Sequence, residues 1–372
     1  MQDEFPNAKN TCYLNSAAQG LLPQSAVRAM HEAAQRQMTP QALGDAEFYE
    51  LPARCRGLLA TMLHCGTEEI AVTSSTGYGL AAIALSLPLA AGDEVLLIEN
   101  DFPANMFAWE ALRSRDVRIR TAPFAPDSNQ TSRVLESIRP ETRAISLSAV
   151  HFYTGYRYDL PAISSFCRGR DIFLVVDAAH AAGCIDLNLN ETHVDAASAA
   201  GHKWQLGPNG AAFLYIHREL LPRLNPAFSG WMSNASATRF ADTRFFGFQP
   251  AGEARRFELG STPHILLAAY EIGLKLLNDS RMQLVEKHNL ALAARVRQLF
   301  EDLGWEVAAT ALPSVIVSAR PPGKYSAADL HRTLREKQVY ISLRQDHLRI
   351  SPHLYNNTQD VDRFFTELKR LL

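Results

Sequence analysis

The chain has 372 residues, of which 47% are hydrophobic and 20% are charged, a balance typical of folded globular proteins. This length and composition exclude a small stapled scaffold, an intrinsically disordered chain and a fibrous repeat. The 37 basic and 39 acidic side chains give a net charge of -2, without the basic excess that is typical of nucleic-acid-binding domains. Nucleic acid is therefore not an expected partner.

No stretch of the sequence is expected to cross a membrane. The longest apolar run, 80–91, is interrupted by Ser86 and Pro88 and is shorter than the ~20 residues of a spanning helix. The polar N-terminus is typical of neither a secretory signal nor a transit peptide, which predicts a cytoplasmic protein. The five cysteines show no CxxC spacing and the twelve histidines no HExxH pattern, so the sequence predicts reduced thiols and no metal site.

Between residues 69 and 217, short apolar runs alternate with helical patterns. The expected strands, most of them apolar on both faces, are 70–73, 94–99, 117–121, 144–150, 173–177, 196–199 and 211–216. The helices expected between them include 78–89, 105–115 and 160–168. This alternation predicts an α/β fold whose large domain is built on a mainly parallel seven-stranded sheet.

Periodicity is lost over 219–260, where Gly, Pro, Asn and aromatic residues indicate a long irregular segment. Helical periodicity returns at 265–277 and 282–303, followed by a strand–helix–strand pattern over 305–350 and an amphipathic helix over 358–372. These elements predict a smaller C-terminal α/β domain. The expected division is a large domain over 15–255 and a small domain formed by 1–14 and 256–372.

The first motif that could carry chemistry is VTSSTGYGL, residues 72–80, where a strand leads into hydroxyl residues and then into a helix. Backbone N–H groups and the helix dipole make such a junction an anion site, and Ser75, Thr76 and Gly77 would let a phosphate approach closely. A simple helix cap is an equally good explanation of Ser75 or Thr76 taken alone.

The same segment also satisfies a dinucleotide-binding fingerprint. Gly77, Gly79 and Ala82 fit G-x-G-x-x-A after a strand, and Glu99 follows 22 residues beyond the first of them. Three residues separate the strand from Gly77, whereas a dinucleotide fold normally places that glycine at the end of the strand. A nicotinamide-dependent oxidoreductase is kept as an alternative, as is a non-catalytic protein that uses the fold for binding.

The most specific motif joins LVVDAAHAAG, residues 174–183, to GHKWQLGPNG, residues 201–210. Asp177 ends an apolar strand, at the sheet edge where open α/β folds bind ligands. Lys203 follows 26 residues later in a turn of small and apolar residues. A buried lysine of depressed pKa can form a Schiff base, and an aspartate beneath a pyridinium nitrogen keeps that ring protonated. These are the two protein groups that pyridoxal phosphate requires.

The two segments resemble the aspartate and lysine signatures of class V, fold type I pyridoxal phosphate enzymes. This group holds cysteine desulfurases, selenocysteine lyases, kynureninases and isopenicillin N epimerase-like proteins. The resemblance covers nearly the whole chain and includes YLNSAA (13–18), ENDFPAN (99–105), SAVHFYTG (148–155), RFELGSTP (256–263) and LRISPHLYN (348–356). It implies a pyridoxal 5'-phosphate cofactor and a homodimer with shared active sites.

The resemblance also implies a role toward the cofactor for each matching residue. Lys203 would hold the cofactor as a Schiff base, Asp177 would pair with its ring nitrogen, and His180 would hydrogen-bond its phenolic oxygen. Phe102 would stack on the ring, or Pro103 if the alignment slips by one residue. The phosphate would be held by Ser75, Thr76, Gly77 and His202, and by Ser261 or Thr262 of the partner subunit.

On the substrate side, Arg349 matches the arginine that binds the α-carboxylate as a bidentate pair. Asn15 and His151 are further candidate pocket residues, although His151 could equally be a satisfied core histidine. Arg344 could orient a second acidic group, but a solvated surface arginine explains it more simply.

Two departures from the family pattern bear on function. Ala200 stands where many relatives carry a Ser or Thr that donates to the phosphate. Cysteine desulfurases carry a nucleophilic cysteine shortly before the carboxylate-binding arginine, whereas the last cysteine here is Cys184. We therefore predict an enzyme that moves the Cα proton of an amino acid through Lys203 and then performs β-elimination as a lyase, epimerisation or transamination, rather than persulfide chemistry.

Overall fold

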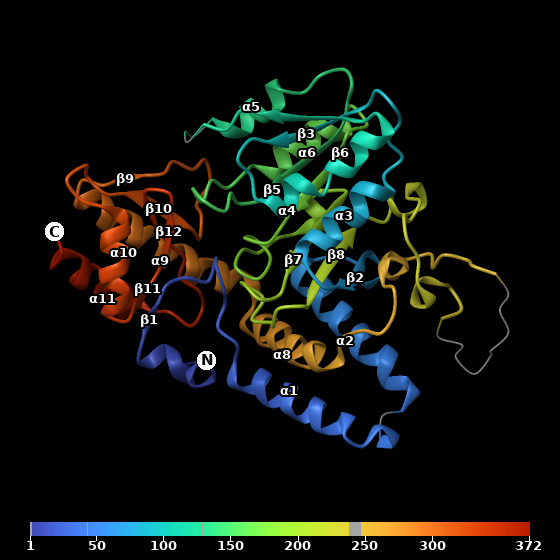
Figure 1. The fold of residues 1–372 in the computed structure, drawn as a ribbon, viewed down its shortest axis with the longest axis horizontal. Helices are drawn as coiled ribbons and strands as arrows, with labels where there is room; N and C mark the ends of the chain where they lie inside the picture. The colour runs from blue at the N-terminus through green and yellow to red at the C-terminus, as the bar shows by residue number, and fades with distance from the viewer. Residues whose placement is uncertain (1, 43, 126, 128, 238–246) are drawn as a thin grey trace.

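A seven-stranded sheet forms the centre of the larger part of the molecule (Figure 1). The computed structural model describes all residues except 1, 43, 126, 128 and 238–246. In spatial order the strands are β2 (Ile70–Thr73), β8 (Ala212–Ile216), β7 (Ala196–Ala200), β6 (Phe173–Asp177), β5 (Thr142–Ser148), β3 (Glu94–Ile98) and β4 (Arg118–Ala122). Strand β8 pairs antiparallel with β2 and β7, and the remaining neighbours pair parallel. The predicted mainly parallel seven-stranded sheet is confirmed.

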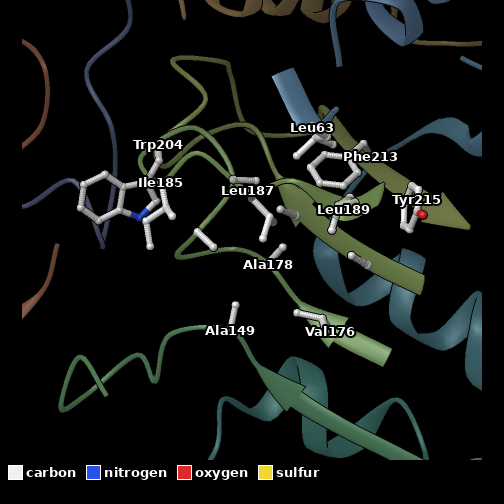
Figure 2. Close-up of a cluster of buried hydrophobic side chains, with 14 of the residues drawn as sticks. Leu63, Ala149, Val176, Ala178, Ile185, Leu187, Leu189, Trp204, Phe213 and Tyr215 are labelled. Carbon is white, nitrogen blue, oxygen red and sulfur yellow. The ribbon is translucent and has the colours of Figure 1, made fainter. Parts of the chain in front are cut away.

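The strands are apolar on both faces because a hydrophobic cluster lies on each side of the sheet. Along β6, Leu174 and Val176 belong to one cluster, whereas Phe173 and Val175 belong to the other. This alternation is the two-residue period of a strand with both faces buried. Figure 2 shows part of the first cluster, which runs from Phe213 on β8 through Leu187 to Trp204.

Helices and turns connect the strands: α3 (Thr76–Ser86), α4 (Pro103–Phe107), α5 (Gln130–Glu136), α6 (Leu160–Arg168) and α7 (Leu189–Thr192). Helix α3 begins at Thr76 because the Ser75 hydroxyl accepts the Tyr78 N–H at 3.1 Å. The prediction of one continuous helix over 105–115 is wrong. The chain instead tightens after α4 into a 3-10 helix over Glu110–Arg115, and Trp109 between them is fully buried.

Three longer helices, α1 (Gln24–Gln37), α2 (Asp45–Leu63) and α8 (His264–Ser280), lie together beside the sheet (Figure 1). Helix α8 contributes Leu267, Tyr270, Leu274 and Leu277 to the first cluster. Before it, the segment 219–260 is irregular as predicted. Its described residues contain only the 3-10 helices Leu221–Arg223, Trp231–Ser233 and Ala254–Phe257.

The C-terminal third forms a four-stranded antiparallel sheet in the order β12 (Ser342–Arg344), β13 (His347–Ile350), β10 (Val317–Arg320) and β9 (Glu306–Val307). Its helices are α9 (Met282–Asp302), α10 (Ala327–Glu336) and α11 (Thr358–Lys369). The N-terminal strand β1 (Cys12–Tyr13) pairs parallel with β11 (Val339–Tyr340), so Cys12 and Leu14 join the C-terminal core. The division into 15–255 and 1–14 with 256–372 stays a prediction.

Among the residues that the structure describes, no helix is long and apolar enough to span a bilayer.

Candidate active site

The two motif segments meet where the parallel strands of the central sheet end. Asp177 is the last residue of β6, and Lys203 lies three residues beyond the end of β7. The Asp177 carboxylate is only 3% exposed, and in the described part of the chain its one hydrogen bond is to the Ala179 N–H, at 2.9 Å. A buried carboxylate normally accepts several hydrogen bonds, so this one has room for a further charged donor.

The loop that carries Lys203 is clamped by two glycines from distant segments. Gly20 donates its N–H to the His202 carbonyl at 2.8 Å, and a Cβ at residue 20 would lie 1.8 Å from the Lys203 carbonyl oxygen. A Cβ at Gly183, whose φ is +94°, would lie 2.5 Å from the Trp204 carbonyl oxygen. Backbone therefore packs directly on backbone on both sides of Lys203, which fixes the position of its Cα.

A hydrogen bond from Trp204 sets the proton position on His180. The indole Nε1–H can only donate, and it donates to His180 Nδ1 at 3.2 Å. Burial and the nearby Lys203 cation hold the pKa of His180 well below its usual range, so the ring is neutral and carries its proton on Nε2. That Nε2 lies 3.4 Å from Lys203 Nζ and thus presents an N–H toward the lysine amine.

Burial pushes the pKa values of Lys203 and Asp177 toward each other. Desolvation lowers the pKa of the Lys203 amine to about 8, although the Asp177 carboxylate opposes this effect. Desolvation also raises the pKa of Asp177 to about 6, again against the attraction of Lys203. A lysine whose pKa approaches neutrality supplies a nucleophilic amine, and its neutral form can accept the His180 N–H.

Sequence reasoning missed Asp101, which fixes the segment next to Lys203. The buried Asp101 carboxylate accepts hydrogen bonds from Ser148 N at 2.9 Å, Ser148 Oγ at 2.6 Å and Asn105 Nδ2 at 3.0 Å. It also accepts the N–H of Phe102 at 2.7 Å, and the Phe102 ring centroid lies 5.3 Å from Lys203 Nζ. An acid directly before Phe-Pro at the start of a short helix is the sequence signal that could have identified it.

The structure gives His151 a complete set of protein partners. Its Nε2 lies 3.0 Å from the Asn100 carbonyl, and its Nδ1 lies 3.0 Å from the Thr154 hydroxyl. The ring is 1% exposed and stacks on Phe124 at a centroid distance of 4.2 Å. Both ring nitrogens are engaged by the protein, as in a satisfied core histidine.

The candidate phosphate residues lie at two neighbouring points of the site. The Thr76 hydroxyl accepts the Ala200 N–H at 2.9 Å, so the start of α3 is tied to the end of β7. As at every helix N-terminus, the first N–H groups of this eleven-residue helix have no carbonyl partner within the helix. Ser75 and Gly77 belong to this turn, and His202 is adjacent to Lys203. Such a turn is suited to an anion.

Ser261 and Thr262 are not brought to the other candidate residues by any hydrogen bond within the described part of the chain. Ser261 is exposed, with a φ of +49°, and Thr262 is half-buried just before α8.

Arg349 is held in a fixed orientation next to the site. Its Nη1 donates to the Phe152 carbonyl at 2.6 Å, and its Nη2 donates to Ser342 Oγ at 3.2 Å. Ser342 in turn lies 2.5 Å from Asn15 Oδ1, so Asn15 positions the arginine through the serine. Arg349 Nε is buried without a hydrogen-bond partner in the described residues. The guanidinium thus keeps donors free for a ligand.

The dinucleotide interpretation of the Gly77 segment is wrong on structural grounds. A dinucleotide fingerprint requires its strand to lead a parallel βαβ unit, whereas β2 is an edge strand that pairs antiparallel with β8. Gly79 has a packing role instead, because a Cβ there would lie 2.3 Å from Ser198 Oγ on β7.

Replacing Trp204 by phenylalanine is expected to free the His180 proton to move between Nδ1 and Nε2. Long-range ¹H–¹⁵N spectra of histidine-labelled protein should then show a mixture of the two forms, and kcat should fall by roughly tenfold, as for other ligand-orienting contacts. The matched control is Trp305→Phe, because the buried Trp305 indole N–H has no partner among the described residues. Equal effects of both variants would contradict the assigned role.

Comparison with known proteins places these features in one family. The family model described as aminotransferase class-V matches residues 12–364. The chain is 28% identical to a kynureninase of Deinococcus radiodurans, over 81% of this chain and 73% of that protein. It is 27% identical to an isopenicillin N epimerase of Streptomyces clavuligerus, over 96% of this chain and 94% of that protein.

The fold also recurs in a solved structure, that of the cystine C–S lyase C-DES in complex with cysteine persulfide. The two chains share 23% identity with a TM-score of 0.88, and each is covered to 98%. A variant of the same lyase has glycine covalently linked to its PLP cofactor. This likeness confirms the expected fold type I architecture.

Proposed function

The chain belongs to the aminotransferase class-V family, and from this premise we propose that it catalyses a reaction at Cα of an amino acid with Lys203 as its catalytic residue. The cofactor is pyridoxal 5'-phosphate. The observation that carries the proposal is the pairing of the half-buried Lys203, just beyond the end of β7, with the buried Asp177 at the end of β6. Desolvation shifts their pKa values to about 8 and about 6.

The residues fit this cofactor. The buried Asp177 carboxylate, with its single hydrogen bond, suits a protonated ring nitrogen. The His180 Nε2–H suits a phenolic oxygen, and the first turn of α3 suits a phosphate. The Phe102 ring, next to Lys203 Nζ, is a better stacking residue than Pro103, which begins helix α4. When bound, pyridoxal phosphate withdraws electron density from Cα of the substrate.

The chain's own groups then have distinct tasks. The Lys203 amine removes and returns the proton at Cα, and its lowered pKa keeps part of it in the basic form near neutral pH. Arg349 would hold the substrate carboxylate and thereby fix the orientation of the bonds at Cα. Asp101 orients Phe102, and Trp204 orients His180.

For the reaction that follows we propose β-elimination, epimerisation or transamination. The relatives named kynureninase and isopenicillin N epimerase support a reaction of this range. Persulfide chemistry is disfavoured, because burial raises the pKa of all five thiols and thereby suppresses the nucleophilic thiolate. Cys184, the last of them, is fully buried and donates to the backbone carbonyls of His180 and Ala181.

The test is to incubate the purified holoenzyme with single amino acids and to measure keto acid, ammonia, sulfide and the enantiomer ratio of the remaining substrate. We expect keto acid or racemised substrate, and no persulfide on the protein. A persulfide detected by mass spectrometry on any of the five cysteines would contradict the proposal.

We further propose that the enzyme is a homodimer in which Ser261 or Thr262 of the partner subunit completes the phosphate site. Within the described part of the protomer no hydrogen bond joins either residue to the candidate site, and Ser261 is exposed. Sedimentation at concentrations used for the assay should show a dimer, and a fully active monomer would contradict the shared site. The cytoplasmic location stays a prediction.

Replacing Arg349 by lysine is expected to leave cofactor binding intact and to lower kcat/KM for amino acids by roughly 2–4 kcal/mol of transition-state stabilisation. Lysine cannot span the Phe152 carbonyl, Ser342 Oγ and a carboxylate at once, because it lacks the planar fork of donors. Steady-state kinetics and the absorbance of bound cofactor measure the two effects. The control Arg332→Lys changes an exposed arginine on α10, and it should behave as the wild type.

A further inference from the structure

Two arginines share one face of the β12–β13 hairpin. In the register of this hairpin Ser342 lies opposite Arg349, and Arg344 lies opposite His347. Side chains of directly paired residues point to the same face of an antiparallel pair, and so do residues two apart in a strand. Arg344 and Arg349 are therefore diagonal neighbours on one face.

This face is directed at the candidate active site. Arg349 donates to the Phe152 carbonyl at 2.6 Å, and the Tyr153 hydroxyl lies 2.7 Å from His347 Nδ1. The Phe152 ring lies 5.3 Å from the Phe102 ring, which is the ring next to Lys203 Nζ. Consistent with this arrangement, the charge of Arg344 contributes to lowering the pKa values of both Arg349 and Lys203.

The two guanidinium groups lack an acidic partner within the described residues. Arg344 donates only to the Leu343 carbonyl, at 2.8 Å, and neither arginine has a carboxylate within 4 Å there. The nearest acid along the hairpin, Asp346, is paired instead with Arg320 at 2.8 Å and with His347 at 2.7 Å. Two unpaired cations on one half-buried face repel each other, unless anions bind to them.

We propose that the substrate is a dicarboxylic amino acid, whose α-carboxylate binds Arg349 and whose side-chain carboxylate binds Arg344. The inference rests on the proposed function, because it places a substrate in the same site. Arg349 is the anchor for the α-carboxylate, since it is 1% exposed and held by two hydrogen bonds. Arg344 is half-buried and held by one, so it is free to follow side chains of different length. Arg344 is thereby a specificity-determining residue.

The experiment compares isosteric pairs, aspartate against asparagine and glutamate against glutamine, on the holoenzyme. Binding is followed by the change in cofactor absorbance, and turnover by kcat/KM. At least one acid should be preferred to its amide by roughly 10- to 100-fold, the range of a charge-assisted hydrogen bond. Arg344→Gln should remove that preference, so that the acids lose at least about tenfold more in kcat/KM than the amides.

Two further variants exclude a structural or long-range effect of Arg344. Arg344→Lys keeps the charge and should restore part of the preference, whereas Arg332→Gln removes a positive charge from α10 and should leave it intact. Equal binding of acids and amides by the wild type, or equal losses for both in Arg344→Gln, would overturn the proposal. A protein that fails to bind pyridoxal phosphate at all would instead overturn the proposed function.

Discussion

Lys203→Ala is expected to lower amino acid turnover by roughly 10³-fold or more, because it removes the group that moves the Cα proton, and such groups contribute about 10²- to 10⁴-fold. The chain should stay folded, since the loop is held by the contacts of Gly20 and Gly183 with backbone carbonyls rather than by the lysine side chain. Borohydride reduction followed by peptide mapping should attach a pyridoxyl group to Lys203 in the wild type and to no lysine in the variant.

The matched control is Lys275→Ala, which removes an exposed lysine from helix α8. Its turnover and its labelling at Lys203 should equal those of the wild type. Labelling of another lysine in the wild-type protein, or near-normal turnover by Lys203→Ala, would show that the catalytic amine lies elsewhere.

Asp177→Asn is expected to lower turnover but to raise the stability of the cofactor-free protein. Turnover should fall by roughly 10²- to 10⁴-fold, because a neutral amide cannot keep the cofactor ring protonated. The cofactor-free protein should become more stable above pH 6, by on the order of 1 kcal/mol. Burial raises the pKa of Asp177 from 3.8 to about 6, so its ionisation disfavours the folded state increasingly as the pH rises through that interval. Loss of the attraction to Lys203 offsets part of the gain.

Urea unfolding of the cofactor-free variant at pH 5 and pH 8 measures the stability effect, which should be larger at pH 8. The control is Asp195→Asn, since Asp195 accepts the Leu174 N–H at 2.7 Å at the opposite end of β6, and burial raises its pKa as well. That variant should keep normal turnover. Substantial turnover by Asp177→Asn would show that another group pairs with the ring nitrogen.

The strands of the central sheet could be predicted because they are buried on both faces, which leaves uninterrupted apolar runs such as 173–176. The secondary structure of the segment 105–115 was harder to predict. Its helical spacing is real, but the fully buried Trp109 and the 3-10 helix over Glu110–Arg115 depend on packing against residues that are distant in sequence.

The same distinction applies to the candidate site. Lys203 and Asp177 lie in motifs of small and apolar residues, so their chemistry could be predicted from the residues next to them in the sequence. Asp101 accepts hydrogen bonds from Ser148, and Trp204 donates to His180, and in both cases the partner is distant in sequence. An isolated aspartate or tryptophan carries no sign of such a partner. For Arg344 the hairpin register was required before it could be related to Arg349.

The parallel pairing of β1 with β11 affects the order in which parts of the protein can fold during synthesis. Tyr13 is joined to Tyr340, the Asn15 amide oxygen to Ser342, and Gly20 to the lysine loop. Tyr13 and Asn15 are synthesised long before Tyr340 and Ser342, so they acquire these two partners only when β11 and β12 have been made. Contacts of such long sequence separation form late in folding. A nascent chain therefore cannot complete the arginine-bearing side of its site before β11, β12 and β13 have been synthesised.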